Sequence, residues 1–232
     1  MSPEQSFLTA ESKFRLESDS VFYDVGHDIH IGLPAKSDTS TLQQVEQREE
    51  IEWDRNDFGS LEDYKKYNSQ SRVYAAFKEG ECVGLTRIFA GYPETPPFAE
   101  MPFYSEEQRK EVFSLCGRGE IEEVGTAAVN HELSKAPKHF VALHLWRLAY
   151  RDAVESGMQN WGIIMEPRRV EVMNQKFHFT FEQLGPAIPY QGGDCAAFVM
   201  NLQEVDKSMS EHLPELYEWF VKEPLVEVSE AS

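Results

Sequence analysis

The chain has 232 residues, of which 41% are hydrophobic and 12% aromatic, so it can bury a substantial core and is not disordered throughout. Its net charge of −18 argues against a nucleic-acid partner, because a phosphate backbone binds to a basic surface. No stretch approaches the roughly 18 uninterrupted apolar residues of a membrane span, and no secretory signal follows Met1, so we expect a cytoplasmic protein without a membrane span.

The spacing of cysteines and histidines does not match a metal centre. Cys82, Cys116 and Cys195 are far apart and odd in number, which fits neither a zinc motif nor a disulfide framework. We therefore expect all three thiols to be reduced. The histidines do not converge at helical spacing, so the sequence predicts no metal ion and no Ser/His/Asp arrangement.

Residues 1–40 are predicted to form an N-terminal extension that contains a strand near Val21–Gly26. Apolar residues then recur at helical spacing over Thr41–Glu52, with Thr39 or Ser40 as the expected N-cap. A second short helix is expected to begin with the segment Ser60–Asp63.

Two alternating segments, Arg72–Lys78 and Glu81–Ala90, give the clearest local pattern. The dipeptide Glu79-Gly80 between them is typical of a turn, so a β-hairpin is predicted. A proline-rich loop follows at 91–97, and the charged segment Phe103–Phe113 is predicted to be a helix.

The stretch from Glu120 to Leu202 says most about the fold. It contains an apolar strand at 121–129, a polar loop at 131–139, an amphipathic helix at about 140–157 and a buried strand at 161–165. Together these predict a right-handed βαβ unit whose loop lies at the carboxyl end of the first strand. The predicted fold class is α/β, of the α+β type, with a mixed sheet flanked by helices.

The chain is predicted to have three segments. The extension at 1–40 precedes one domain at 41–204, and residues 205–232 form a C-terminal helix and an acidic tail. The helix is expected at about 208–220.

The order of elements over about residues 40–202 resembles the GNAT N-acetyltransferase fold. Val83–Ile88 matches the return strand of its hairpin, and Val124–Val129 matches the strand before its pyrophosphate loop. Asn174–Phe179 reads Asn-Gln-Lys-Phe-His-Phe, where that fold usually has Tyr-Glu-Lys-x-Gly-Phe. The resemblance implies a GNAT-like mixed sheet, with N-terminal helices and a C-terminal helix around it.

Within that fold the sequence resembles the acyl-homoserine-lactone synthases and the N-acyl amino acid synthases. Arg48, followed by Phe58, matches their first-helix arginine and aromatic, and Arg87 matches the arginine that ends a strand. Glu123–Val129 resembles their Glu-x-Ser-Arg-x-Ala-Val, with Thr126 in place of arginine.

The acidic cluster of that branch fits this chain in two registers. Glu52-Trp-Asp54-Arg-Asn-Asp57 has the expected letters but lies early. The better-spaced segment at 62–67 keeps only Glu62. Both registers stay open.

The resemblance implies transfer of an acyl group from a thioester, carried by acyl-carrier-protein phosphopantetheine or by CoA, to the amine of a small molecule. Glu123 is then a candidate general base, and Arg87 a candidate anchor for a carboxylate of the acceptor. The alternative is that these two side chains form a structural ion pair. We expect the donor to bind where strands 121–129 and 161–165 part.

The donor site is expected along the first strand and the following loop. Backbone near Thr126, Ala128 and Val129 faces the thioester in this hypothesis, and positive charge comes from Lys135, Lys138 and His139 at a helix N-terminus. Asn174 occupies the position of a tyrosine acid; its amide can bond a thiol but cannot donate a proton as an acid. A solvated loop and a surface asparagine are the alternatives.

The loop has no glycine between Gly125 and Gly157, so it lacks the usual Gln/Arg-x-x-Gly-x-Gly/Ala motif. A loop without glycine wraps a pyrophosphate less closely, which disfavours ordinary CoA binding and favours a carrier-borne phosphopantetheine. An acyl carrier protein is therefore a candidate partner, and the pair Arg168-Arg169 is a candidate contact for it.

Substrate contacts are hypothesised for Arg48, Trp53, Phe58 and Phe89, although aromatic residues at such spacing are more often core. Two rival functions remain open. One is a CoA-dependent GNAT N-acetyltransferase, and the other is a non-catalytic binding module that keeps the fold without the chemistry.

Overall fold

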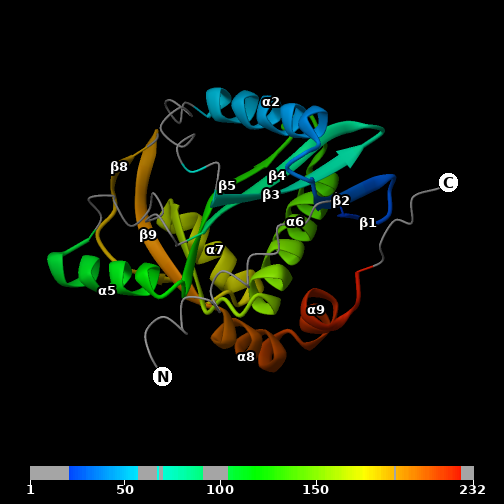
Figure 1. Cartoon of the computed structure of the whole chain (residues 1–232). Coiled ribbons are helices and arrows are strands. Elements are labelled where there is room, and N and C mark those ends of the chain that lie inside the picture. The colour runs from blue at the N-terminus through cyan, green and yellow to red at the C-terminus, as the bar shows by residue number, and fades with distance from the viewer. Residues whose placement is uncertain (1–20, 57–66, 68–69, 91–103, 191, 226–232) are drawn as a thin grey trace, which may run out of the picture.

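A mixed β-sheet forms the centre of the molecule (Figure 1). The computed structural model describes residues 21–56, 67, 70–90, 104–190 and 192–225. These residues build a nine-stranded sheet in the order β1-β2-β3-β4-β5-β6-β9-β7, with β8 paired to β9. In this part of the chain no helix is both long and apolar enough to cross a membrane.

The first five strands are antiparallel neighbours in chain order. They are β1 (Val21–Asp24), β2 (Ile29–Leu33), β3 (Ser71–Lys78), β4 (Glu81–Ala90) and β5 (Ile121–Val129). The predicted hairpin is confirmed, and its turn places both Glu79 (φ 52°) and Gly80 (φ 82°) in the left-handed region that two-residue hairpin turns require. Since β1 and β2 belong to the sheet, the predicted N-terminal extension contributes two of its strands.

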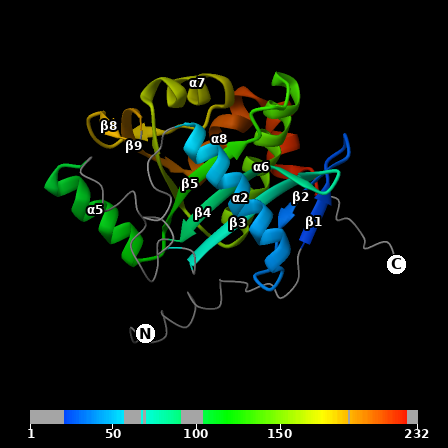
Figure 2. The same cartoon turned by 90° about the horizontal axis from the view of Figure 1, so that it is seen from above.

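Helix α2 (Thr39–Arg55) packs on β4 and β5 and crosses the strands when seen from above (Figure 2). Two apolar side chains of α2 are buried: Val45, which packs with Ala75 and Leu85, and Trp53, which packs with Phe89. The N-cap prediction was wrong by one residue or two: Asp38 caps the helix, because its carboxylate accepts a hydrogen bond from the Thr41 amide. The second short helix predicted near Ser60 lies outside the described residues, as does the loop at 91–97.

Helix α5 (Glu106–Gly117) also contacts β5. It begins three residues later than predicted, because Ser105 and Gln108 form a reciprocal capping box there. It ends at Gly117 rather than at Phe113.

Helix α6 (Lys135–Glu155) covers the other face of the sheet and contributes several core side chains, among them Leu145, Trp146 and Tyr150. It begins five residues before the predicted start at 140, so the second half of the predicted loop 131–139 is helix. The sequence pattern was misleading because Pro137 is tolerated in the first turn, where no intrahelical N–H is needed.

The βαβ prediction is confirmed by β6 (Asn160–Met165), which pairs parallel to β5. Helix α7 (Pro167–Phe177) follows, then β7 (Glu182–Gln183), β8 (Ile188–Tyr190) and β9 (Gly193–Asn201). Strand β9 pairs antiparallel with β6 and contacts both short strands, β7 and β8.

The single C-terminal helix predicted at 208–220 was wrong. Helix α8 (Leu202–His212) stops before Pro214, and α9 (Pro214–Tyr217) leads into a π-helical turn, η2 (Glu218–Lys222). This turn buries Phe220 and stacks Trp219 on the Arg147 guanidinium, 4.8 Å from the ring centre.

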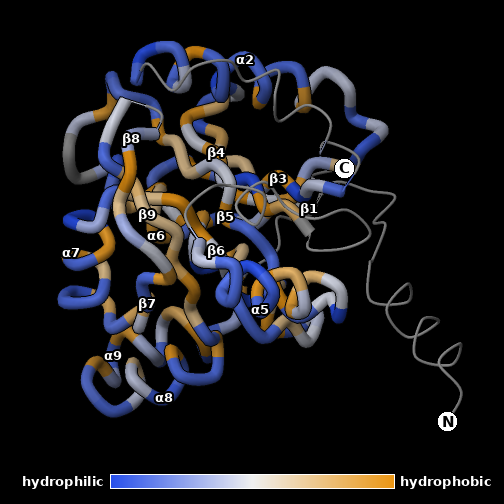
Figure 3. The backbone as a smooth tube through the Cα atoms, turned by 90° about the vertical axis from the view of Figure 1, so that its left-hand side faces the viewer, coloured by the Kyte–Doolittle hydropathy of each residue, from blue (hydrophilic) through white to orange (hydrophobic). Residues whose placement is uncertain are grey.

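The interior follows the sheet, where the apolar segments, orange in Figure 3, gather between more hydrophilic helices. One polar network lies inside it. Arg72 binds both Glu122 and Asp152, and Tyr74 donates a hydrogen bond to Asp152. Burial raises the pKa of the Glu122 carboxyl, and the Arg72 guanidinium partly offsets that effect.

The three cysteines are free, as the sequence predicted, and the structure shows that they are also buried. Burial raises the pKa of the Cys82 thiol to about 11 and that of Cys116 to about 12, and it also raises the pKa of Cys195.

These thiols are therefore expected to react slowly with a disulfide reagent at pH 8 in the native protein, because the thiolate is the reactive form. After unfolding in guanidinium all three should react within seconds to minutes. The measurement is the time course of thionitrobenzoate release from Ellman's reagent. A rapid native phase would contradict the prediction, and Cys195→Ser would show whether that thiol is its source.

Candidate functional site

The parallel strands β5 and β6 part toward their carboxyl ends. They pair in register from Ile121 with Asn160 to Val124 with Ile163. Beyond that point β5 runs on through residues 125–129 beside β4, whereas β6 stays paired with β9. This is the separation that the sequence predicted for the donor site.

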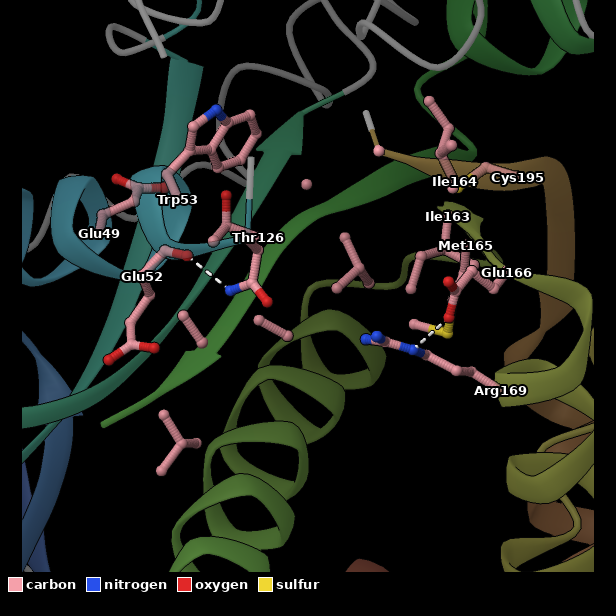
Figure 4. A pocket seen from close by; sticks show the side chains of 18 of the residues that line it. Glu49, Glu52, Trp53, Thr126, Ile163, Ile164, Met165, Glu166, Arg169 and Cys195 are labelled. Carbon is pink, nitrogen blue, oxygen red and sulfur yellow. Dashed lines mark hydrogen bonds and ion pairs between the residues drawn. The ribbon is translucent and has the colours of Figure 1, made fainter. Parts of the chain in front are cut away.

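A cavity of about 400 Å³ lies where the strands part (Figure 4). Its walls come from α2, the end of β5, the loop after it, the start of α6, β6, the start of α7 and the start of β9. The residues that line it are Glu49, Glu52, Trp53, Arg55, Asn56, residues 124–129, His131, Lys138, residues 163–166, Arg169, Gly192, Gly193 and Cys195.

A bulge in β5 marks the edge of the cavity. Arg87 lies opposite Thr126 and Ile88 lies opposite Val124, so Gly125 is an extra residue in the ladder. A Cβ atom on Gly125 would stand 2.0 Å from Cε2 of the buried Phe89 ring. Only glycine therefore allows the bulge and this ring to coexist.

The α2 wall of the cavity is acidic. Glu49 is 1% exposed and Glu52 is 4% exposed, yet both line the cavity. The Glu49 carboxylate accepts hydrogen bonds from Arg87, at 3.0 Å from Nε to Oε1, and Arg87 also donates to the Ser71 hydroxyl. Glu52 Oε1 accepts from the His131 backbone N–H at 3.1 Å and lies 3.0 Å from His131 Nδ1.

The loop after β5 is held by hydrogen bonds within itself and to α2 and α6. The amides of residues 131, 132 and 133 donate to Glu52, to the Asn130 side chain and to the Asn130 carbonyl, respectively. Lys138 Nζ donates to the His131 carbonyl at 2.6 Å. A pyrophosphate cradle needs free amides at this place, and these three are already engaged.

The opposite wall comes from β6, α7 and β9. Ile163, Ile164 and Met165 make it largely apolar, and Glu166 pairs with Arg169 at 2.6 Å from Oε2 to Nε. Figure 4 shows this pair across the cavity from Glu52. The carboxylates on both walls therefore have arginine partners: Arg169 for Glu166, Arg87 for Glu49, and Arg48 and Arg55 for Glu52.

No family model and no curated protein matches the chain. Solved structures do resemble it. An N-acyl amino acid synthase, FeeM, from uncultured soil microbes is 14% identical, with a TM-score of 0.62 over 78% of this chain and 94% of that one. The acyl-homoserine-lactone synthase LasI is 17% identical, with a TM-score of 0.57 over 80% and 94%. A CoA-dependent acyl-homoserine-lactone synthase, MesI, is 15% identical, with a TM-score of 0.51 over 78% and 94%.

The chain has the GNAT-like fold of these synthases. The predicted fold class is thereby confirmed. At identities of 14% and 17% the likeness shows the fold and not the chemistry.

Three of the predicted donor contacts lie on the splayed end of β5 in this GNAT-like fold. Thr126, Ala128 and Val129 all line the cavity. Lys138 lines it as well, whereas His139 is exposed on α6 and is not among the lining residues. The side chain of Lys135 lies outside the described part of the structure.

Asn174 has a structural partner that the sequence did not suggest. Its amide donates to the Phe181 carbonyl at 2.8 Å and accepts from the Phe181 N–H at 2.9 Å. Both ends of the side chain thus hold the segment after α7. It is not among the residues that line the cavity, and its role at the donor stays a prediction.

Glu123 is 2% exposed and is absent from the residues lining this cavity, so the expectation that it faces the cleft is not met here. Its carboxylate lies on the α5 side, near Tyr104 and Cys116. Burial of these two groups is the main cause that raises their pKa values, and the negative charge of Glu123 raises them further. The strand alternation explains this, because Ile121, which shares its face, packs against Cys116. Its role as a base stays a prediction.

The two arginines predicted at the acceptor site both tie α2 to the sheet. Arg87 binds Glu49, as described above, which is a partner the sequence did not suggest. Arg48 donates to the Cys82 carbonyl at 3.0 Å and lies 3.5 Å from Glu52. Their roles toward a substrate stay predictions.

Of the three aromatic candidates, Trp53 lines the cavity, and Phe89 packs with Trp53 and Tyr67 in one buried cluster. Phe58 lies outside the described residues, as does Glu62 of the acidic-cluster register. Sequence reasoning missed Glu49, His131 and Glu166 as cavity residues, although His131 and Glu166 each stand at or just past the end of an apolar strand.

Proposed function

We propose that this protein is an N-acyltransferase, which moves an acyl group from a thioester donor to the amine of a small molecule. The observation that carries the proposal is the parting of β5 and β6 with a cavity between them. A pantetheine arm is an extended chain with two amides, and it can pair with strand backbone at such an opening.

The β5 side of the opening supports this role. Between Gly125 and Val129 the strand pairs with β4 on one side, and its register with β6 has ended. In a strand, N–H and C=O groups point alternately to the two edges, so part of this segment aims polar groups into the cavity. Such groups also suit the carbonyl oxygen of a thioester under attack, at Thr126, Ala128 or Val129.

The acceptor is proposed to be a small amine that carries positive charge before it reacts. Glu49 and Glu52 place two largely buried carboxylates on the α2 wall, and their oxygens are candidate acceptors for an ammonium N–H, shared with the arginines that already bind them. Arg87 would reach a carboxylate of the acceptor only by sharing or exchanging its bond to Glu49. Glu123 stays in the proposal as an alternative base.

For the donor, a phosphopantetheine on an acyl carrier protein is preferred to CoA. The engaged amides at 131, 132 and 133 support this choice, because they cannot turn to a pyrophosphate without breaking their present bonds. Arg168 is exposed beside the cavity and is the candidate contact for an acidic carrier protein.

The test is release of free thiol from acyl-carrier-protein and acyl-CoA donors across a panel of amines, with the amide product identified by mass spectrometry. Thiol release that requires an amine is the expected result. Transfer from acetyl-CoA alone would favour the N-acetyltransferase alternative. Tight donor binding with no thiol released from any donor would favour the non-catalytic binding module.

Filling the opening should abolish the activity. Ala127 lines the cavity with an exposed side chain, so Ala127→Trp is expected to lower thiol release at least 100-fold through steric exclusion of the arm. Ala127→Ser is the matched control and should keep activity within a fewfold of the wild type. Both should melt near the wild-type temperature, and full activity of Ala127→Trp would exclude this opening as the donor site.

A further inference from the structure

A glutamate and a histidine from distant parts of the chain meet at the cavity wall. Glu52 is on the last full turn of α2, and His131 is the second residue after β5. Glu52 Oε1 lies 3.0 Å from His131 Nδ1 and also accepts the His131 backbone N–H at 3.1 Å. Both residues line the cavity between β5 and β6.

The Glu52 carboxylate sets the tautomer of the His131 ring. A carboxylate only accepts hydrogen bonds, so Nδ1 carries the proton that joins the two groups, and the lone pair of the neutral ring is on Nε2. The side chain of His131 is 31% exposed, whereas that of Glu52 is 5% exposed. Within the described part of the chain, Nε2 has no hydrogen-bond partner.

The surrounding bonds hold the pair in place. Arg48 Nη1 lies 3.5 Å from Glu52 Oε1 and Arg55 Nη1 lies 3.9 Å from Oε2, so two arginines flank the carboxylate. Lys138 binds the His131 carbonyl, which fixes the loop from the α6 side. His131 is thus held at three points: its backbone amide, its ring and its carbonyl. These bonds keep the ring in one orientation in the cavity wall.

The geometry points to a Glu52–His131 dyad that takes the proton from the acceptor amine. This inference rests on the proposed function. His131 is the catalytic residue, because its Nε2 meets the substrate, and Glu52 is a positioning residue that orients the ring and stabilises the imidazolium that forms.

The acceptor nitrogen loses two protons in the reaction, and each has a destination. Nε2 removes one proton from the ammonium form of the acceptor, and the neutral nitrogen attacks the thioester carbonyl to form a C–N bond. When the C–S bond breaks, the thiolate takes a proton from the imidazolium. The second proton lost by the nitrogen goes to solvent, so the products are an amide, a free thiol and one proton.

The other carboxylates of the cavity are less suited to this task. Glu49 is engaged by Arg87, and Glu166 is engaged by Arg169. Removing a proton from an amine would require each to loosen an ion pair first. In the dyad only Nδ1 of His131 is bound to Glu52, so Nε2 can accept a proton without breaking that contact.

The test compares His131→Ala with the wild type in the thiol-release assay, with added imidazole as a probe. A general base typically contributes about 10²–10⁴-fold, so kcat/KM should fall within that range while donor binding is kept. Imidazole at tens of millimolar should restore part of the rate, which a purely structural role would not allow. His30→Ala, an exposed histidine on β2, is the matched control and should keep full activity.

Glu52→Gln tests the positioning role at constant volume. The amide can present an N–H to Nδ1 and so favour the wrong tautomer, which should lower kcat at least tenfold and leave KM for the donor within twofold. Melting temperatures show whether each variant is folded. His131→Gln, which can still donate to Glu52, replaces His131→Ala in the assay if the alanine variant does not fold.

The outcomes separate the two proposals. An active wild type with unchanged turnover in His131→Ala, or a loss that imidazole does not reduce in either His131 variant, would overturn the dyad alone. A wild type that releases no thiol from any donor and amine would overturn both the dyad and the acyltransferase proposal.

Discussion

Removing the Glu49 carboxylate is expected to lower the free energy of unfolding by about 3–5 kcal/mol, the range for breaking a buried ion pair from one side. In Glu49→Ala the Arg87 guanidinium, 6% exposed, keeps its charge but loses the carboxylate that binds it. The bond from Arg87 to the Ser71 hydroxyl involves no opposite charge and cannot replace the carboxylate. Urea unfolding followed by circular dichroism measures the effect.

Two comparisons make this result specific. Glu50→Ala, an exposed neighbour on α2, should change the unfolding free energy by less than about 0.5 kcal/mol. The double variant Glu49→Met/Arg87→Met replaces both charges by apolar groups and should recover most of the loss. If Glu49→Ala were as stable as Glu50→Ala, the pair would not hold α2 to the sheet.

The double variant also separates structure from chemistry at Arg87. If Glu49 and Arg87 only fasten α2, a folded Met/Met protein should still transfer acyl groups with unchanged KM values. If either side chain also contacts the acceptor, KM for the amine should rise while KM for the donor stays constant.

Gly125→Ala should destabilise the protein by about 1–3 kcal/mol, because the added methyl group enters the space of the Phe89 ring. The ring is 0% exposed and packs with Trp53 and Tyr67, so it has little room to move. The variant should also lose activity, since the bulge at Gly125 directs the following residues along the cavity. Thermal and urea unfolding provide the measurement.

Gly117→Ala is the matched control, because a Cβ there meets no atom within 4 Å. It should be neutral or up to about 1 kcal/mol more stable, since alanine favours a helix. Gly125→Ala combined with Phe89→Leu should lose less than the two single changes together. A Gly125→Ala protein as stable as the control would show that the bulge does not depend on glycine.

The sequence predicted the sheet better than the helix ends. Strand alternation and the Glu79-Gly80 turn located β3 and β4 to within a residue, and the apolar run gave β5 its observed bounds. Helix ends depend on single side chains, such as the Asp38 cap and the capping box of Ser105 and Gln108, which a hydrophobic period does not register.

The opening between β5 and β6 was predictable because a βαβ unit fixes which strand ends lie together. The residues that line the opening were harder to predict. Glu52 and His131 are 79 positions apart and meet only because α2 lies over β5, and no local pattern sets the rotation of that helix. Glu123 was misplaced relative to this cavity for a similar reason, since which face of a half-buried strand meets the cavity depends on its neighbours.

The strand order also says when this cavity can appear during folding. β1 to β5 follow one another in both chain and sheet, so they can assemble by successive local closures. β6 can join only after α6 has crossed the sheet, and β9 only after the chain has passed through α7 and two short strands. We therefore expect strands β1 to β5 to form before β6 and β9 enclose the cavity.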